Sequence, residues 1–100
     1  MEFNEFIKQC WSTAESKGWH EDKPPITEKI LLVHCELSEA VEALRDPKKN
    51  NNEFKEEIAD VFIRLFDMCG EYKELDDIQT MIRWKMEKNL NRPHRHGKLF

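Results

Sequence analysis

Apolar residues recur at the spacing of one helical face in four segments of the chain. In the first segment, residues 2–17, they stand three or four positions apart up to Gly18, as they do on one side of an α-helix. The same spacing runs over residues 27–45, from residue 51 or 52 to 70, and from residue 76 or 77 toward 90. No segment alternates between apolar and polar positions as a half-buried strand does. The pattern predicts an all-α, bundle-like fold of four helices with short connections.

Helix breakers stand between or just beyond these segments. Pro24 and Pro25 forbid a helix in the loop "GWHEDKPPI", and Thr27 is the expected N-cap of the second helix. The other expected caps are residues of the same capping type: Asn51 or Asn52 for the third helix, and Asp76 or Asp77 for the fourth.

The length of 100 residues suits one domain, residues 1–100, in which 91–100 form a basic irregular tail. Three substantial helices and a fourth make a thin core for this length. We therefore expect a homo-oligomer.

Charge and cysteine content narrow the class of protein. The net charge of −4 argues against stable binding to nucleic acid or to an anionic membrane, because both need a basic face. No apolar run approaches a membrane span, and the start "MEFNEFIKQC" is unlike a signal peptide. Cys10, Cys35 and Cys69 lack C-x-x-C spacing and lie in helical patterns, so we expect buried free thiols in a reducing cytoplasm.

Two pairs of acids stand beside the apolar stripes of the second and third helices. "HCELSEAVEALRD" contains Glu36 and Glu39, and "EEIADVFIRLF" contains Glu57 and Asp60. Residues three apart share a helical face, so antiparallel packing brings the two pairs across from each other. Oxygen-only ligands favour Mg²⁺, with Mn²⁺ as a substitute. A solvated acidic face, neutralised by a nearby arginine, remains the alternative.

A magnesium site in turn indicates a substrate that carries phosphates. The chain has no glycine-rich phosphate loop, so metal and basic side chains must hold the phosphates. Basic residues gather late in the chain, where a phosphate clamp and a solvated terminus remain equally open readings. The absence of an E-x-x-H motif disfavours a di-iron site.

The motif "CELSE" followed by "EEIAD" resembles the paired acidic motifs of the MazG-like nucleotide pyrophosphohydrolases, an all-α superfamily. "KGW", "RLFDMCGEY" and the ending "KMEKNLNRPHRHGK" resemble the small single-domain branch of that family. The resemblance implies hydrolysis of a nucleoside triphosphate, ribo or deoxy, to the monophosphate and pyrophosphate, as housecleaning of the nucleotide pool. It also implies a homodimer or homotetramer whose site neighbouring chains complete. Many members carry another acid where this chain has Cys35.

The resemblance also implies roles for individual residues. The expected Mg²⁺ ligands are the four acids Glu36, Glu39, Glu57 and Asp60. Glu39 is the expected base for the attacking water, and Glu57 the second catalytic carboxylate. The expected phosphate contacts match the C-terminal positions of the family: Lys85, Asn89, Arg92, His96 and Lys98. For His96, a packing role or a place in the tail is equally open.

Three aromatic side chains are candidates for stacking on a nucleobase, because every base has a π face. Trp11 lies on an apolar helix face, where core packing is the favoured reading. For Trp19, in the loop, a ligand or subunit contact and plain packing are equally open. His34 lies near the apolar stripe, which favours a packed core histidine over a ligand contact. Two other functions stay open: hydrolysis of another diphosphate, such as a phosphoribosyl-linked one, and a non-catalytic oligomeric module with an acidic groove.

Overall fold

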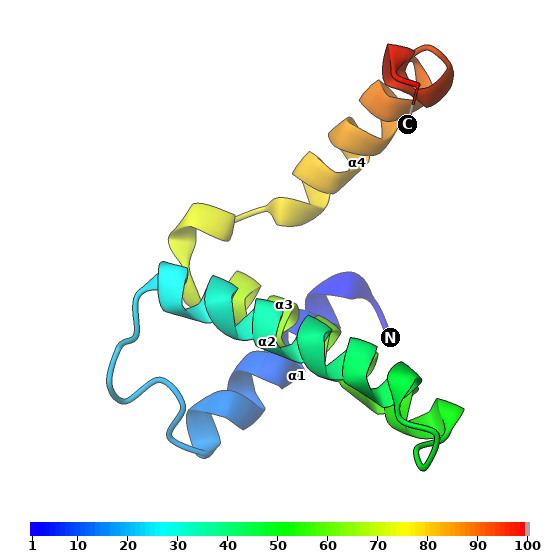
Figure 1. Ribbon diagram of the computed structural model, residues 1–100. Helices are drawn as coiled ribbons and strands as arrows, with labels where there is room; N and C mark the ends of the chain where they lie inside the picture. Colours follow the sequence, from blue (N-terminus) through cyan, green and yellow to red (C-terminus); the bar gives the residue numbers. More distant parts are fainter. Residues whose placement is uncertain (100) are drawn as a thin grey trace.

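The computed structural model describes residues 1–99, and every regular element among them is helical (Figure 1). The elements are α1 (Phe3–Ser16), α2 (Ile26–Arg45), α3 (Asn51–Glu71), the 3₁₀ helix η1 (Lys73–Leu75), α4 (Ile78–Leu90) and the 3₁₀ helix η2 (His94–Gly97). The predicted all-α fold with four helices is confirmed. The tail predicted to be irregular contains one helical turn, η2.

The helix starts differ in detail from the predicted caps. The side chain of Asn50 accepts a hydrogen bond of 3.1 Å from the backbone N–H of Glu53, so the cap of α3 lies one residue before the predicted positions. Thr27 lies inside the first turn of α2, and the prediction that it caps this helix is wrong. Pro25 holds the cap position instead, where its fixed φ suits the approach to a helix. Asp77 directly precedes α4, as predicted, although its carboxylate accepts no backbone N–H.

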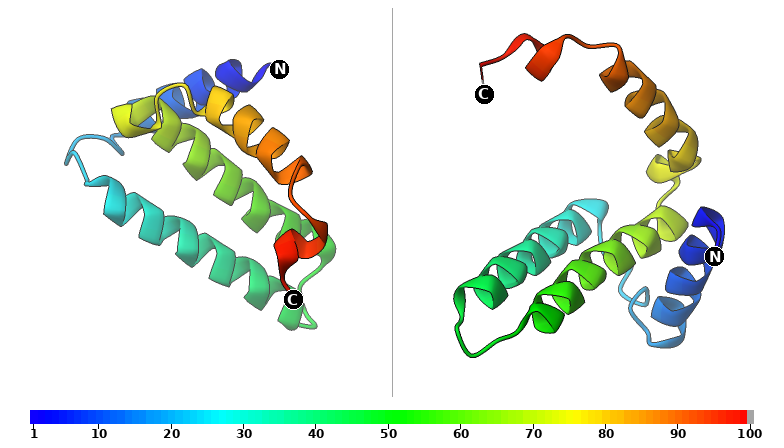
Figure 2. Two further views of the ribbon diagram at one scale, coloured as in Figure 1. Left: turned by 90° about the horizontal axis from the view of Figure 1, so that it is seen from above. Right: turned by 90° about the vertical axis from the view of Figure 1, so that its right-hand side faces the viewer.

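The third helix is the centre of the fold, because α1 and α2 both pack along it (Figure 2). Gly70 lies inside α3, although it was predicted to end that helix. A Cβ added at Gly70 would lie 2.9 Å from Cβ of Trp11, closer than packed carbon atoms approach. Glycine is therefore required there for the contact between α1 and α3. At the other end of α1, the ring of Phe66 packs on Phe3 and Phe6 at centroid distances of 5.4 and 5.2 Å.

The second helix turns small and polar residues toward the protein interior. Glu36, Ala40 and Ala43 are buried, whereas Val41 and Leu44 are 53% and 62% exposed. The predicted apolar stripe of this segment therefore lies largely in solvent in the single chain, and the prediction that it faces the core is wrong for its larger members. Close approach of α2 to α3 through alanines explains this, because small side chains let the two helices and the acids between them come together.

The fourth helix leads away from the three packed helices (Figures 1 and 2). The Cα radius of gyration is 16.3 Å, whereas a compact chain of this length has about 13 Å. Large apolar side chains on α4 are consequently exposed, among them Trp84, Met86 and Leu90. Within residues 1–99, no helix combines the length and the apolar character that crossing a membrane requires.

Candidate functional site

Three carboxylates meet where α2 faces α3. Glu36, which is buried, and Glu39, which is exposed, come from α2, and the half-buried Glu57 comes from α3. One carboxylate oxygen from each lies within 4.8 Å of the other two. We call this group the acidic trio. The fourth predicted ligand, Asp60, lies outside it on the exposed side of α3, next to a hollow that Glu36 also borders.

Several oxygens of this region are buried without a hydrogen-bond partner. Among residues 1–99 they are Oε2 of Glu36 and of Glu57, and Oε2 of Glu53 one turn earlier on α3. A buried acceptor oxygen that has lost its hydrogen bonds to water, and has gained none within the protein, lowers the stability of the fold. Glu53 was not singled out from the sequence. Its signal was the four-residue step to Glu57, which places both residues on one face of α3.

The charges of the acidic trio act on Glu57. Burial raises the pKa of the Glu57 carboxyl above its ordinary value, and the neighbouring Glu39 carboxyl, together with the charges of Asp60 and Glu36, raises it further. Like charges this close favour either a proton on Glu57 or a cation between the carboxylates. The donor set is oxygen-only and carries partnerless atoms, so it fits a hard divalent cation such as Mg²⁺ or Mn²⁺.

One member of the acidic trio also has a partner from within the chain. Nε of Arg64 donates a hydrogen bond of 2.9 Å to Oε1 of Glu36. The reading that an arginine neutralises these acids is thus correct for one oxygen of one carboxylate. Arg45 of α2 does not share this role, because its Nη1 lies 3.7 Å from Oε1 of Glu42 on the surface of the helix.

Next to the acidic trio, a hollow of about 540 Å³ lies between α1, the loop that follows α1, α2 and α3. This size is typical of small-molecule sites. Its walls combine apolar side chains, such as Phe6 and Ile63, with the charged Lys29, Arg64 and Asp67. Trp19, which is 58% exposed, stands at its edge. The hollow runs along α2 from Lys29 to Glu36, so it connects the acids to a region rich in apolar surface.

No family model, curated protein or solved structure matches the chain. The family resemblance therefore rests on the two acidic motifs and the C-terminal run. What the structure adds is geometric: the acidic trio, its partnerless oxygens and the adjoining hollow.

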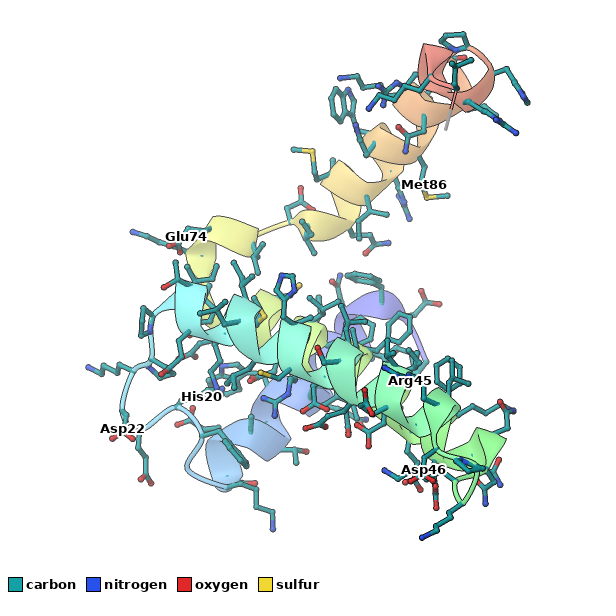
Figure 3. All side chains as sticks on the ribbon, viewed as in Figure 1. His20, Asp22, Arg45, Asp46, Glu74 and Met86 are labelled. Atoms are coloured by element: carbon teal, nitrogen blue, oxygen red, sulfur yellow. The ribbon has the colours of Figure 1, made fainter. Side chains whose placement is uncertain are left out.

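The loop after α1 is anchored by a buried histidine that the sequence reading missed. His20, labelled in Figure 3, points between α1 and α3. Its Nδ1 lies 2.7 Å from Oε2 of Glu15, and its Nε2 lies 2.8 Å from Oδ1 of Asp67. Burial alone lowers the pKa of His20, but the hydrogen bonds to Glu15 and Asp67 and the charges of Asp67 and Glu71 raise it above the ordinary value.

Two aromatic candidates for base contact have different places in the structure. Trp11 stacks on His20 with ring centroids 5.3 Å apart, and its Nε1 donates a 2.9 Å hydrogen bond to Glu71. It serves packing, as the favoured reading held. Trp19 reaches the hollow.

The third aromatic candidate, His34, is exposed on α2 and does not border the hollow. The prediction of a packed core histidine is wrong. Its azimuth follows the apolar stripe, and that stripe faces solvent in the single chain.

The predicted phosphate contacts lie away from the acidic trio within one chain. Lys85 and Asn89 belong to α4, which leads away from α2 and α3, and Arg92 and Lys98 follow it (Figure 1). The side chain of His96 lies outside the described part of the structure. Nζ of Lys88 lies 5.0 Å from the ring centroid of Trp84, within the range of a cation–π contact.

The three cysteines are free, as predicted. Burial raises the pKa of the Cys10 and Cys69 thiols, which are half-buried. Cys35 is exposed on α2, so the prediction that all three are buried is wrong for this residue.

Proposed function

We propose that the protein is a Mg²⁺-dependent nucleoside triphosphate pyrophosphohydrolase of the MazG-like type, which converts (d)NTP and water to (d)NMP and pyrophosphate. Its role would be housecleaning of the cytoplasmic nucleotide pool. The observation that carries this proposal is the acidic trio, in which buried oxygens of Glu36 and Glu57 lack partners beside a hollow of nucleoside size.

In this proposal Glu36, Glu39 and Glu57 hold Mg²⁺, and Asp60 joins them from the exposed side of α3. The bound ion supplies Lewis acidity and lowers the pKa of a ligating water. Arg64 fixes the Glu36 carboxylate through Oε1 and leaves Oε2 for the ion. This is the positioning that a ligand usually receives from a neighbouring hydrogen bond.

Glu39 is the base of the proposed reaction, because it is the exposed member of the acidic trio and can reach water at the edge of the site. The water oxygen forms a bond to the α-phosphorus while the bond from that phosphorus to the bridging oxygen breaks. Glu39 takes the proton of the water, and pyrophosphate leaves with the bond electrons. No covalent intermediate on the protein is required.

The proposal includes a second copy of the chain, in a homodimer or homotetramer. Lys85 and Arg92 lie on or beyond α4, which leads away from the acids of its own chain (Figure 2). Exposed apolar residues on α2 and α4, such as Leu44 and Leu90, give two chains surface to bury. A basic α4 laid on the acidic α2–α3 face of another chain also matches opposite charges.

The test is to incubate the protein with a panel of canonical and modified nucleoside triphosphates, with Mg²⁺ or with EDTA, and to separate the products by anion exchange. Monophosphate plus pyrophosphate, lost in EDTA, is the expected result. Glu57→Gln should abolish it, whereas Glu56→Gln, an exposed neighbour on α3, should not.

Three outcomes contradict the proposal. Diphosphate plus orthophosphate would place the attack at the terminal phosphate. Turnover confined to a phosphoribosyl-linked diphosphate would favour a related hydrolase with another substrate. No turnover of any compound would favour an acidic interaction module.

A further inference from the structure

A lysine without an ionic partner among the described residues borders the hollow beside the acidic trio. The side chain of Lys29 borders the hollow, and the residue is only 8% exposed. Among residues 1–99, no carboxylate forms an ion pair with it. The buried part of Lys29 is its apolar stem, because Nζ is not among the buried side-chain atoms that lack a partner. Its ammonium group is therefore open to the hollow.

The other charges around the hollow are accounted for. Arg64 is paired with Glu36, and Asp67 is paired with His20. Asp60 is the remaining acid, and it lies toward the acidic trio, where the proposed cation binds. The lysine is therefore the one charged side chain of the hollow that neither a described neighbour nor the proposed metal neutralises.

An ammonium group has three donors and no acceptor, so the group that satisfies Lys29 must supply a lone pair. Seven residues of helix separate Lys29 from Glu36, which places them about 10 Å apart along α2. A nucleotide with phosphates at the acidic trio extends its base over such a distance. The apolar walls at Phe6 and Ile63, and Trp19 at the edge, suit a flat ring rather than another phosphate.

We propose that this hollow receives the nucleobase and that Lys29 donates a hydrogen bond to a carbonyl oxygen of the base, which makes Lys29 a specificity-determining residue. This rests on the proposed function for the identity of the ligand. Where a base presents an amino group to Lys29, donor meets donor and no hydrogen bond forms between them. The chain therefore favours the keto base over the amino base where two bases carry these groups at the same ring position, as hypoxanthine and adenine do, and uracil and cytosine.

The test compares kcat/KM for the triphosphates of inosine and adenosine, and of uridine and cytidine, in wild type, Lys29→Met and Lys8→Met. Lys8 is an exposed lysine on α1 and serves as the matched control. We expect wild type and Lys8→Met to favour the keto member about 10- to 100-fold, the value of a hydrogen bond to a charged donor. In Lys29→Met this ratio falls toward one.

An equal loss for both members in Lys29→Met would overturn the inference, because a phosphate contact or a purely structural role acts on every nucleotide alike. Wild type without a keto preference in either pair would overturn it as well, and that result needs no variant to fold.

Calorimetry in EDTA, with the monophosphates of inosine and adenosine, separates this inference from the proposed function. A preference for the keto monophosphate that depends on Lys29, without hydrolysis of any triphosphate, would support the base site and contradict the enzyme. Hydrolysis with an unchanged keto-to-amino ratio would support the enzyme and contradict the base site.

Discussion

Arg64 and Glu36 form an ion pair of 2.9 Å across α3 and α2, yet the second oxygen of Glu36 is buried without a partner among the described residues. The pair therefore neutralises only part of the negative charge where the two helices meet. Glu36 has a neighbour within its own chain and still has capacity for a cation.

Replacing Arg64 tests whether a cation also neutralises the charge of Glu36. In EDTA, Arg64→Gln should lower the free energy of unfolding by about 1–3 kcal/mol, because Glu36 loses its charged donor. In Mg²⁺ the loss should shrink, since the cation replaces part of the missing charge. Chemical denaturation in the two buffers measures the difference. Arg45→Gln, whose contact to Glu42 is exposed, should stay within about 0.5 kcal/mol. An equal loss for Arg64→Gln in both buffers would argue against a cation at the acidic trio.

Replacing Glu57 should raise the stability of the metal-free protein and weaken its stabilisation by Mg²⁺. The pKa of Glu57 is raised, so its ionised form opposes folding once the pH exceeds the folded-state pKa. Glu57→Gln should therefore raise Tm in EDTA at neutral pH. Wild type should gain about 2.7 kcal/mol at about 100 times the Kd of Mg²⁺, and the variant should lose most of this gain. Thermal melts with and without Mg²⁺ test both statements, with Glu56→Gln as the control. A lower Tm for Glu57→Gln in EDTA is the contrary result.

The buried histidine predicts a pH dependence of stability. The pKa of His20 is raised by Glu15, Asp67 and Glu71, so its contribution is fully present below the unfolded pKa of about 6.5. It is lost as the pH rises through the higher folded-state pKa. The difference in unfolding free energy between wild type and His20→Gln should therefore shrink as the pH rises from 6.5. Urea titrations over a pH series measure it.

The exposed His34 provides the control for this experiment. His34→Gln leaves the contacts of His20 with Glu15 and Asp67 intact, so it measures the effect of removing a histidine elsewhere in the chain. A His20→Gln difference that stays constant, or grows with pH, would show that the carboxylates do not hold a charged imidazole.

At Gly70, α1 and α3 approach each other too closely to leave room for a side chain. Gly70→Ala improves helix propensity, yet the new methyl group meets Trp11 at 2.9 Å. We expect destabilisation of about 1–3 kcal/mol from overpacking. Ala59→Gly, on the exposed side of α3, calibrates the propensity effect at about 1 kcal/mol in the same helix. Equilibrium unfolding of both variants decides the matter, and a more stable Gly70→Ala would mean that the helices are not in close contact there.

Periodicity and helix breakers were enough to predict the number, order and approximate limits of the helices. They did not predict which face of α2 is buried. Leu44 and Val41 lie in solvent and Glu36 lies inside, because Ala40 and Ala43 let α2 approach α3 through its small side. Hydrophobicity alone cannot distinguish a face that meets the core from a face that a second chain could cover.

The local spacing of the acids was visible in the sequence, whereas their partners were not. Glu36 and Glu57 could be placed on neighbouring faces by counting turns, but the Arg64 contact depends on how two helices are aligned. Neither Lys29, near the start of the second predicted helix, nor His20, in the loop before it, was singled out from the sequence. Both are buried by contacts from segments remote in the chain, which a single-sequence pattern does not contain.

The most direct test of the central claim is hydrolysis in water enriched in the heavy isotope of oxygen, with whichever nucleotide turns over fastest, followed by mass spectrometry of the products. We expect the label to enter only the monophosphate, because water attacks the α-phosphorus, and EDTA or Glu57→Gln to abolish this incorporation. Label in pyrophosphate or orthophosphate, or incorporation that persists in EDTA, would contradict the account.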